Sequence, residues 1–213
     1  MTVSNRTIVL AGATSAAGLT VAQRLLEAGA HVVATGRSAE RLEPLRANGA
    51  QVEVADATSL GAMNELAARL GPVDGVIPLV GGWRGGGGLA GQTDADFEAL
   101  LPALHAVRAT SRAFEAALLA SDAGRFAIVS STAVARPLAG GANYAAVKAA
   151  SEAWARAVAQ GFAKSAREAE APLRAASVVF RAKAVDPGAL ADAIRALWDA
   201  EGPDLNDQVV ALD

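Results

Sequence analysis

The chain contains no cysteine, only two histidines and no basic tract, and each shortage excludes a class of chemistry. Without cysteine there is no disulfide, no thiolate nucleophile and no cysteine-ligated metal. The two histidines, His31 and His105, argue against a histidine-based metal site. The net charge is −3 and lysine and arginine do not cluster, so the sequence predicts no nucleic-acid partner.

Long apolar runs are also missing, although 52% of the 213 residues are hydrophobic. A bilayer-spanning helix needs about 20 apolar residues in succession, so we predict no membrane segment. Arg6 and the apolar stretch Thr7–Ala13 share some features with a signal peptide. The stretch is better interpreted as a strand that enters a glycine turn. We therefore predict a cytoplasmic protein with one domain, residues 1–213.

Short β-rich runs alternate with longer helical patterns. Strands are expected at Thr7–Ala11, His31–Thr35, Gln51–Val54, Val73–Leu79, Arg125–Ser130, Arg174–Phe180 and Gln208–Leu212. Helices are expected at Ala17–Ala28, Ala39–Ala47, Leu60–Leu70, from a cap at Asp94 or Asp96 to about Ala120, and at Asn143–Ala166 and Pro187–Ala200. This alternation predicts an α/β protein with a Rossmann-type, doubly wound sheet of seven mostly parallel strands, covered by helices on both faces.

A turn of small residues follows the first strand and leads into a helix. Glycine in such a turn lets the backbone approach a pyrophosphate, and the helix N-terminus offers free N–H groups and a positive dipole end. The same residues would also suit a turn that is merely tightly packed. We predict that the turn binds a dinucleotide through Gly12, Thr14, Ser15, Ala17 and Gly18.

Two further positions fit the adenosine end of a dinucleotide. The second strand ends in Thr35-Gly36-Arg37-Ser38, without the acidic residue that would hold the ribose 2′-hydroxyl of NAD. Arg37 can pair with a 2′-phosphate, which favours NADP, or it can be a solvated arginine at the sheet edge. Asp56 can accept a hydrogen bond from the adenine amino group or fix a turn, and the sequence leaves both roles open.

Tyr144, the only tyrosine, lies four residues before Lys148 and thirteen after Ser131. A helix would place the phenol and the ammonium on one face. A free phenol has a pKa of about 10, and a nearby cation lowers that pKa toward useful acid–base chemistry. Ser131 can offer a second hydroxyl to the same substrate oxygen. The alternative is a helical Tyr and Lys spaced by chance, beside an unrelated serine.

In this order the motifs resemble the short-chain dehydrogenase/reductase family over nearly the whole chain. The resemblance is carried by the glycine turn 12–18, by Asp56, by Val80-Gly81-Gly82, by Ser131 with Tyr144 and Lys148, and by the closing segment Leu205–Asp213. It implies NADPH along the C-terminal edge of the sheet, with Val80, Gly81, Tyr144 and Lys148 among its contacts, and hydride transfer to a carbonyl or from an alcohol of a small molecule.

The resemblance also implies catalytic roles. Tyr144 would donate the proton to the developing alkoxide. Lys148 would lower the pKa of the tyrosine and hold the nicotinamide ribose, and Ser131 would hydrogen-bond the carbonyl oxygen.

The chain departs from the family pattern in the phosphate turn, the fourth strand and the long helix. Ala16 replaces the middle glycine, which is tolerated where the backbone needs no positive φ. Pro78-Leu79 replaces two asparagines, so other groups must satisfy the backbone there. The long helix lacks the asparagine of the family's proton relay, whose position falls near Leu104; His105 is either a substitute for it or a buried or interface histidine.

A further departure follows the sixth strand. Val178-Val179-Phe180-Arg181 runs within a few residues into Asp186-Pro187-Gly188, which is typical of a helix start. The family's Pro-Gly pair and its substrate-binding lobe are therefore missing. We expect an open site that Trp83 and the glycine loop Gly81–Gly91 partly cover.

Three functions are compatible with these residues. The first is an NADPH-dependent carbonyl reductase or alcohol dehydrogenase. The second is an NADP(H)-binding sensor or partner protein with little or no turnover. The third is a scaffolding domain without cofactor, which the retained glycine turn argues against. The two long alanine-rich helices, together with the resemblance, predict a homodimer or homotetramer, unless they pack only against the sheet.

Overall fold

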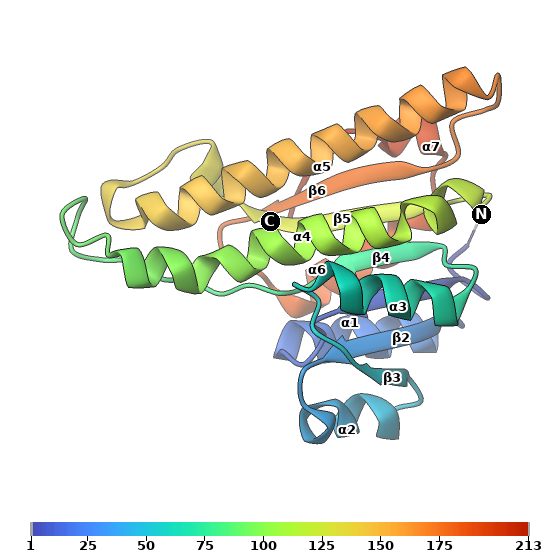
Figure 1. Ribbon diagram of the computed structural model, residues 1–213, viewed down its shortest axis with the longest axis horizontal. Coiled ribbons are helices and arrows are strands. Elements are labelled where there is room, and N and C mark those ends of the chain that lie inside the picture. The colour runs from blue at the N-terminus through green and yellow to red at the C-terminus, as the bar shows by residue number, and fades with distance from the viewer. Residues whose placement is uncertain (1, 213) are drawn as a thin grey trace.

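The computed structural model describes residues 2–212, so Asp213 of the predicted closing segment lies outside the described residues. One sheet has the strand order β3-β2-β1-β4-β5-β6-β7, and every pair of neighbours is parallel. The predicted seven-stranded Rossmann-type sheet is confirmed (Figure 1). The strands are β1 (Thr7–Ala11), β2 (His31–Gly36), β3 (Gln51–Val54), β4 (Gly75–Pro78), β5 (Arg125–Ser131), β6 (Ala176–Ala182) and β7 (Val209–Ala211).

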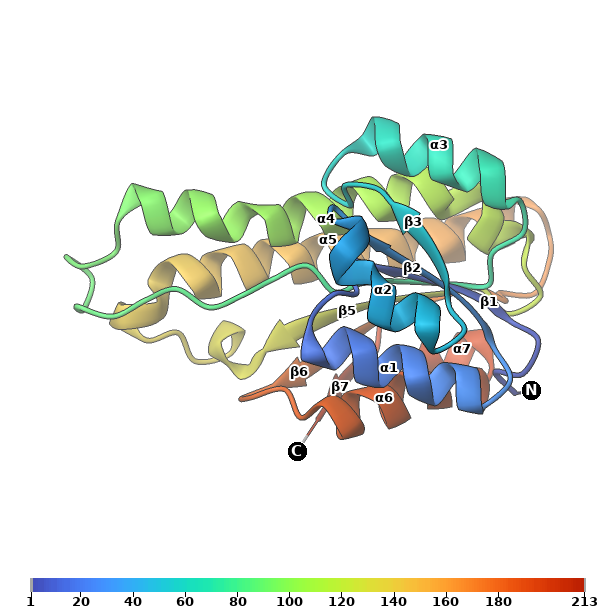
Figure 2. The ribbon, with the colours of Figure 1, turned by 90° about the horizontal axis from the view of Figure 1, so that it is seen from below.

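Helices cover both faces of this sheet (Figures 1 and 2). They are α1 (Ala16–Glu27), α2 (Ala39–Ala47), α3 (Leu60–Leu70), α4 (Asp94–Ala120), α5 (Ala142–Glu168), α6 (Pro187–Arg195) and the short α7 (Gly202–Leu205). α1, α2 and α6 share one apolar cluster with one face of β1, and α3, α4 and α5 share another with the opposite face. A strand buried on both faces needs a continuous apolar run, which explains the β1 sequence TIVLA.

Successive residues of β1 contribute to the two clusters in turn. Ile8 and Leu10 belong to the cluster with α1 and α6, whereas Val9 and Ala11 belong to the cluster with α4 and α5. This alternation is the ordinary consequence of strand geometry. The edge strand β3 is different, because its burial is only partial and Val54 is exposed.

Some predicted boundaries are wrong for identifiable reasons. α4 is capped by Thr93, whose hydroxyl accepts from the Asp96 amide at 3.1 Å, and not by Asp94 or Asp96, which lie inside the first turn. β6 begins two residues later than predicted and continues to Ala182, because its end pairs with the end of β5. The last predicted helix stops being α-helical at Arg195 and closes with a 3-10 turn, Ala196–Trp198.

The site lies where α4 and α5 outgrow the sheet. α4 has 27 residues and therefore spans about 40 Å. β5 has 7 residues and spans only about 23 Å. The N-terminal parts of both helices project past the strands with the loops that precede them (Figure 2). A third apolar cluster, which includes Leu100, Val147 and Tyr144, holds the two projecting parts together.

Among the described residues, no helix is long and apolar enough to cross a membrane. The cytoplasmic location expected from the sequence stays a prediction.

Candidate active site

The turn between β1 and α1 requires two of its glycines. Gly12 has φ +80°, and a Cβ at this position would come within 2.5 Å of Val80 Cγ2. A Cβ at Gly18 would come within 2.2 Å of the Ala13 carbonyl oxygen. Ser15 caps α1, because its hydroxyl accepts from the Gly18 amide at 3.1 Å. The turn therefore has the close-packed geometry that brings backbone N–H groups and a helix N-terminus to a phosphate.

Ala16, which replaces the family's middle glycine, is the first residue of α1. Asn5, Glu170 and Asp207 are the non-glycine residues with positive φ in the described part of the chain, and Ala16 is not among them. The backbone at residue 16 therefore needs no positive φ, so alanine can replace glycine there without strain.

The ends of β2 and β3 carry the residues predicted for the adenosine end. Arg37 is exposed directly after β2. Arg41, one turn further on, donates from Nη2 to the Thr14 carbonyl at 3.3 Å, so a second guanidinium lies against the phosphate turn. Arg41 was not predicted from the sequence, although its place in the first turn of the helix that follows Arg37 was a usable signal.

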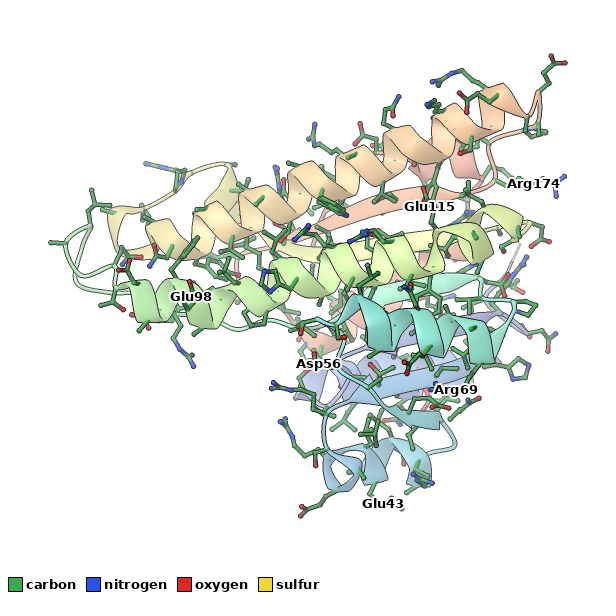
Figure 3. The ribbon with its side chains drawn as sticks, in the orientation of Figure 1. Glu43, Asp56, Arg69, Glu98, Glu115 and Arg174 are labelled. Atoms are coloured by element: carbon green, nitrogen blue, oxygen red, sulfur yellow. The ribbon has the colours of Figure 1, made fainter. Side chains whose placement is uncertain are left out.

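Asp56 lies before α3, at the N-terminal end of that helix (Figure 3). Its Oδ1 accepts from the Thr58 amide at 2.9 Å and from the Thr58 hydroxyl at 2.8 Å, so the turn role is observed. Burial alone would raise the pKa of Asp56, but the Thr58 hydrogen bonds and the charge of Arg37 outweigh it and lower that pKa. The contact with adenine stays a prediction.

A cavity of about 1070 Å³ opens at the C-terminal ends of β1, β4, β5 and β6. The predicted site residues that line it are Ser15, Ala17, Val80, Gly81, Ser131, Tyr144 and Lys148. The other predicted residues do not line it but lie at the same edge of the sheet: Gly18 in the first turn of α1, and, in the turns that follow β1, β2 and β3, Gly12, Thr14, Arg37 and Asp56. The helix-capping serine of the phosphate turn and the tyrosine therefore face one space.

Tyr144 and Lys148 lie one turn apart near the start of α5, as predicted. The Lys148 ammonium is 5.7 Å from the centroid of the Tyr144 ring and donates to the Val129 carbonyl at 2.7 Å. Burial lowers the pKa of Lys148 to about 8, against the opposing effect of the Glu152 charge. This amine therefore exchanges its charge close to neutral pH, which suits acid–base chemistry.

Ser131 ends β5 and is buried at the floor of the cavity. Its Oγ accepts from the Ala133 amide at 3.2 Å and so fixes the 3-10 turn Thr132–Val134. A hydroxyl is one donor and up to two acceptors, so this bond leaves the proton of Ser131 available to a substrate oxygen.

A buried charge network lies behind these residues. Glu152, one turn after Lys148, accepts from the Ser130 hydroxyl at 2.6 Å and from Arg181 Nε at 2.8 Å. Ser130 and Arg181 are register partners on β5 and β6, so both reach the same carboxylate on α5. Burial alone would raise the pKa of Glu152, but hydrogen bonds from Arg181 and Ser130 outweigh it and lower that pKa. No local sequence pattern predicted this network, because its members are 22 and 29 residues apart in the chain.

Two positions at which the family has asparagine carry leucine here, Leu79 after β4 and Leu104 in α4. The Leu79 amide donates to the Ala11 carbonyl at 2.8 Å, so backbone pairing satisfies the end of β4 without an asparagine side chain. Leu104 packs in the cluster that contains Tyr144 and offers no polar group. His105 is exposed and does not line the cavity, so the expectation of a buried histidine is wrong and a relay role has no support. Its place in an interface stays untested.

The chain between β6 and α6 consists of residues 183–186 alone, which confirms that a substrate-binding lobe is missing here. Trp83 and Val185 line the mouth of the cavity, so the glycine loop contributes to its wall as expected.

The family described as short chain dehydrogenase matches residues 6–167. The chain belongs to the short-chain dehydrogenase family. No curated protein matches this dehydrogenase by sequence.

Solved structures of short-chain dehydrogenases share the fold of this one. A metagenomic short-chain oxidoreductase in complex with NADP is 25% identical, with a TM-score of 0.77 and coverage of 99% of this chain and 98% of that chain. A short-chain dehydrogenase from Salmonella enterica serovar Typhi is 19% identical, with a TM-score of 0.84 and coverage of 99% and 97%. A short-chain type dehydrogenase/reductase from Mycobacterium ulcerans is 18% identical, with a TM-score of 0.84 and coverage of 100% and 90%.

Proposed function

We propose that this short-chain dehydrogenase is an NADPH-dependent oxidoreductase that reduces a carbonyl group, or oxidises the corresponding alcohol, with Tyr144 as general acid and base. One observation carries the proposal. Ser131, Tyr144 and Lys148 line the same cavity as Ser15 and Ala17 of the phosphate turn. A proton donor thus faces the space in which a dinucleotide on that turn would extend.

The residues present fit such a cofactor. Gly12 and Gly18 keep the phosphate turn tightly packed, because a Cβ at either would clash with Val80 or with the Ala13 carbonyl, and a Cβ at Gly81 would lie 3.9 Å from the Lys148 ammonium. Ser15, Ala17, Val80, Gly81 and Lys148 would hold the dinucleotide along the cavity. When bound, the reduced nicotinamide supplies the hydride.

The chain's own residues supply the proton and the orientation. Ser131 donates a hydrogen bond to the carbonyl oxygen and aligns it with the Tyr144 hydroxyl. Tyr144 gives its proton to the oxygen as negative charge develops there, and the Lys148 cation stabilises the phenolate that remains. The Val129 carbonyl fixes the ammonium in place at 2.7 Å.

The preference for NADP(H) is supported by the arginines after β2. Arg37 is exposed there, and Arg41 already contacts the phosphate turn through the Thr14 carbonyl. Two guanidinium groups, with no acidic residue in the segment Thr35–Ser38 at the end of β2, suit a 2′-phosphate rather than a free 2′-hydroxyl. The 25% identical metagenomic oxidoreductase in complex with NADP is consistent with this choice.

Oxidation of NADPH with a panel of ketones, diketones and quinones tests the proposal. Turnover is expected with at least one compound, and Tyr144→Phe is expected to lower kcat about 100-fold or more in a protein that still binds NADPH. NADPH binding without turnover across the panel would select the second function, a sensor or partner protein. The apolar Leu104 at the relay position favours that alternative. No binding of NADPH would contradict both.

The proposal includes a homodimer or homotetramer built on α4 and α5, which lie side by side on one face of the molecule (Figures 1 and 2). Exposed small residues on α5, such as Ala149 and Ala153, allow close approach of a second helix. Light scattering that shows a clean monomer at micromolar concentration would refute this assembly.

A further inference from the structure

Half of the exposed large apolar side chains in the described part of the chain line the cavity. Among the described residues six large hydrophobic side chains are exposed, and three of them line the mouth of the cavity: Trp83, Leu138 and Val185. Trp83 is 61% exposed and Leu138 72% exposed. Single exposed apolar residues are ordinary, but several around one cavity indicate a surface that a ligand covers.

Two of these side chains come from loops that flank the catalytic residues. Trp83 follows Val80 and Gly81 after β4, and Leu138 lies between Ser131 and Tyr144 in the β5–α5 connection. The two loops are joined directly, because the Gly86 amide donates to the Gly140 carbonyl at 2.7 Å. Trp83 and Leu138 therefore belong to one continuous wall.

Gln92 holds this wall to the start of α5. Its Nε2 donates to the carbonyls of Gly86 at 3.0 Å, Gly88 at 3.3 Å and Gly140 at 3.1 Å. Its Oε1 accepts from the amide of Asn143, the residue before the catalytic tyrosine, at 3.2 Å. One side chain thus ties the glycine loop, the β5–α5 connection and the catalytic helix together, which preorganises the wall.

The loops also touch without intervening side chains. A Cβ at Gly85 would come within 2.4 Å of the Gly140 carbonyl oxygen and within 3.0 Å of the Trp83 ring. The indole therefore lies close to the Gly85 backbone of its own loop and contributes an aromatic side chain to the lining of the cavity. An aromatic side chain of this kind interacts favourably with the aromatic ring of a ligand.

The charges around the cavity narrow the choice of ligand. Among the described residues, the titratable side chains that line it are Arg136, Tyr144, Lys148 and Lys183, and none of the lining side chains is a carboxylate. A cationic amine would meet only like charge here, whereas a neutral or anionic compound would not.

From these observations we propose that Trp83 and Leu138 form the substrate wall of this dehydrogenase, in place of the missing lobe, and that they select a bulky carbonyl compound with an aromatic ring next to the reacting group. This inference rests on the proposed reductase function. It adds the substrate class and the residues that recognise it.

Two diketones test the selection: 1-phenyl-1,2-propanedione, which has the ring, and 2,3-butanedione, which lacks it. The wild type is expected to show the higher kcat/KM with the phenyl compound. Trp83→Ala is expected to raise KM for the phenyl compound about tenfold and to change KM for butanedione less than about twofold. Leu138→Ala should also raise KM for the phenyl compound. Gln92→Ala should raise the same KM, because it removes the hydrogen bonds that hold the glycine loop and the β5–α5 connection together.

Leu89→Ala is the matched control. Leu89 lies on the same glycine loop and is 69% exposed, but it does not line the cavity. Its replacement should leave both KM values and the Kd of NADPH unchanged. NADPH affinity should also be unchanged in Trp83→Ala, because the indole is assigned to the substrate and not to the cofactor.

Failure of the selection and failure of the proposed function give different results. If the wild type turns over the diketones but Trp83→Ala raises both KM values equally, or lowers NADPH affinity, the assignment of the wall is overturned and the reductase function stands. No turnover of either diketone by the NADPH complex would count against the reductase. In that case calorimetric binding of 1-phenyl-1,2-propanedione to the NADP complex decides: binding that Trp83→Ala weakens supports the wall, and no binding overturns it.

Discussion

Lys148 experiences two opposed electrostatic effects. Burial favours its neutral form and lowers its pKa to about 8, whereas the negative charge of Glu152 favours the cation. The ammonium acts on Tyr144 only while it is charged. As pH rises through about 8 the cation is lost, and the charge that would stabilise the phenolate left by proton transfer is lost with it.

We therefore expect kcat/KM for carbonyl reduction to fall above a pH of about 8. Glu152→Gln removes the charge that raises the pKa of Lys148, so the descending limb should move to lower pH. The measurement is the rate of NADPH oxidation from about pH 6 to about pH 10 in both proteins. An unmoved limb in Glu152→Gln would show that another group titrates. Glu152→Gln also leaves Arg181 without its carboxylate, so a loss of about 3 kcal/mol in stability is expected alongside.

Arg125 is fully buried at the start of β5 and has backbone carbonyls as partners. Its guanidinium donates to the carbonyls of Leu197 at 2.7 Å, Arg174 at 2.7 Å and Ala200 at 2.8 Å. Burial lowers its pKa to about 10, so the group remains charged at neutral pH. One side chain thus joins β5 to the segments before β6 and after α6.

Arg125→Met is expected to destabilise the protein by about 3 kcal/mol, because buried carbonyls lose their donor. Denaturant unfolding measures the change. Arg112→Met, at an exposed position of α4, is the control and should change the free energy of unfolding by less than about 0.5 kcal/mol. Equal effects of the two variants would contradict the role given to Arg125.

At the scale of the element, the β1–α1 turn depends on Gly18. A Cβ here would lie 2.2 Å from the Ala13 oxygen and 2.6 Å from its carbonyl carbon, and both are backbone atoms of the same turn. Gly18→Ala is therefore expected to cost about 2–3 kcal/mol in stability and to abolish NADPH binding. Ala16→Gly, at the first residue of α1, should cost at most about 1 kcal/mol and keep the binding. Fluorescence titration with NADPH and thermal unfolding test both variants.

Sequence signals that are local predicted the elements well. α2 and α3 have the predicted bounds, because Asn48-Gly49 and Gly71-Pro72 end them. The Tyr144–Lys148 pair was also a local signal. Contacts between distant segments gave no such signal: Gln92 and Gly140 are 48 residues apart, and Arg181 and Glu152 are 29 apart. The extension of β6 to Ala182 and the wall of the cavity follow from such contacts, so a reading of single segments could not find them.

At the scale of the whole molecule, a bound cofactor would link the two halves of the sheet. The turns after β1, β2 and β3 carry the predicted phosphate and adenosine residues, whereas Tyr144 and Lys148 pack beside β5. A dinucleotide that spans this edge contacts both halves and binds only the folded chain. Binding therefore raises the free energy of unfolding, by about 2.7 kcal/mol when the cofactor concentration is about 100 times its Kd.

This linkage makes cofactor choice measurable without a substrate. At equal concentrations NADPH should raise Tm by more than NADH does. Because the two cofactors differ only in the 2′-phosphate, the difference in Tm measures what that phosphate contributes to binding. Arg37→Ala is expected to lower the NADPH shift to the NADH value, and Arg41→Ala to lower it in part, because Arg41 also holds the Thr14 carbonyl. Arg46→Ala, on the same helix as Arg41, is the control, because Arg46 pairs with Glu43 at 3.3 Å. If NADH stabilised the wild type as strongly as NADPH, the 2′-phosphate would have no site here and the arginines after β2 would be surface residues only.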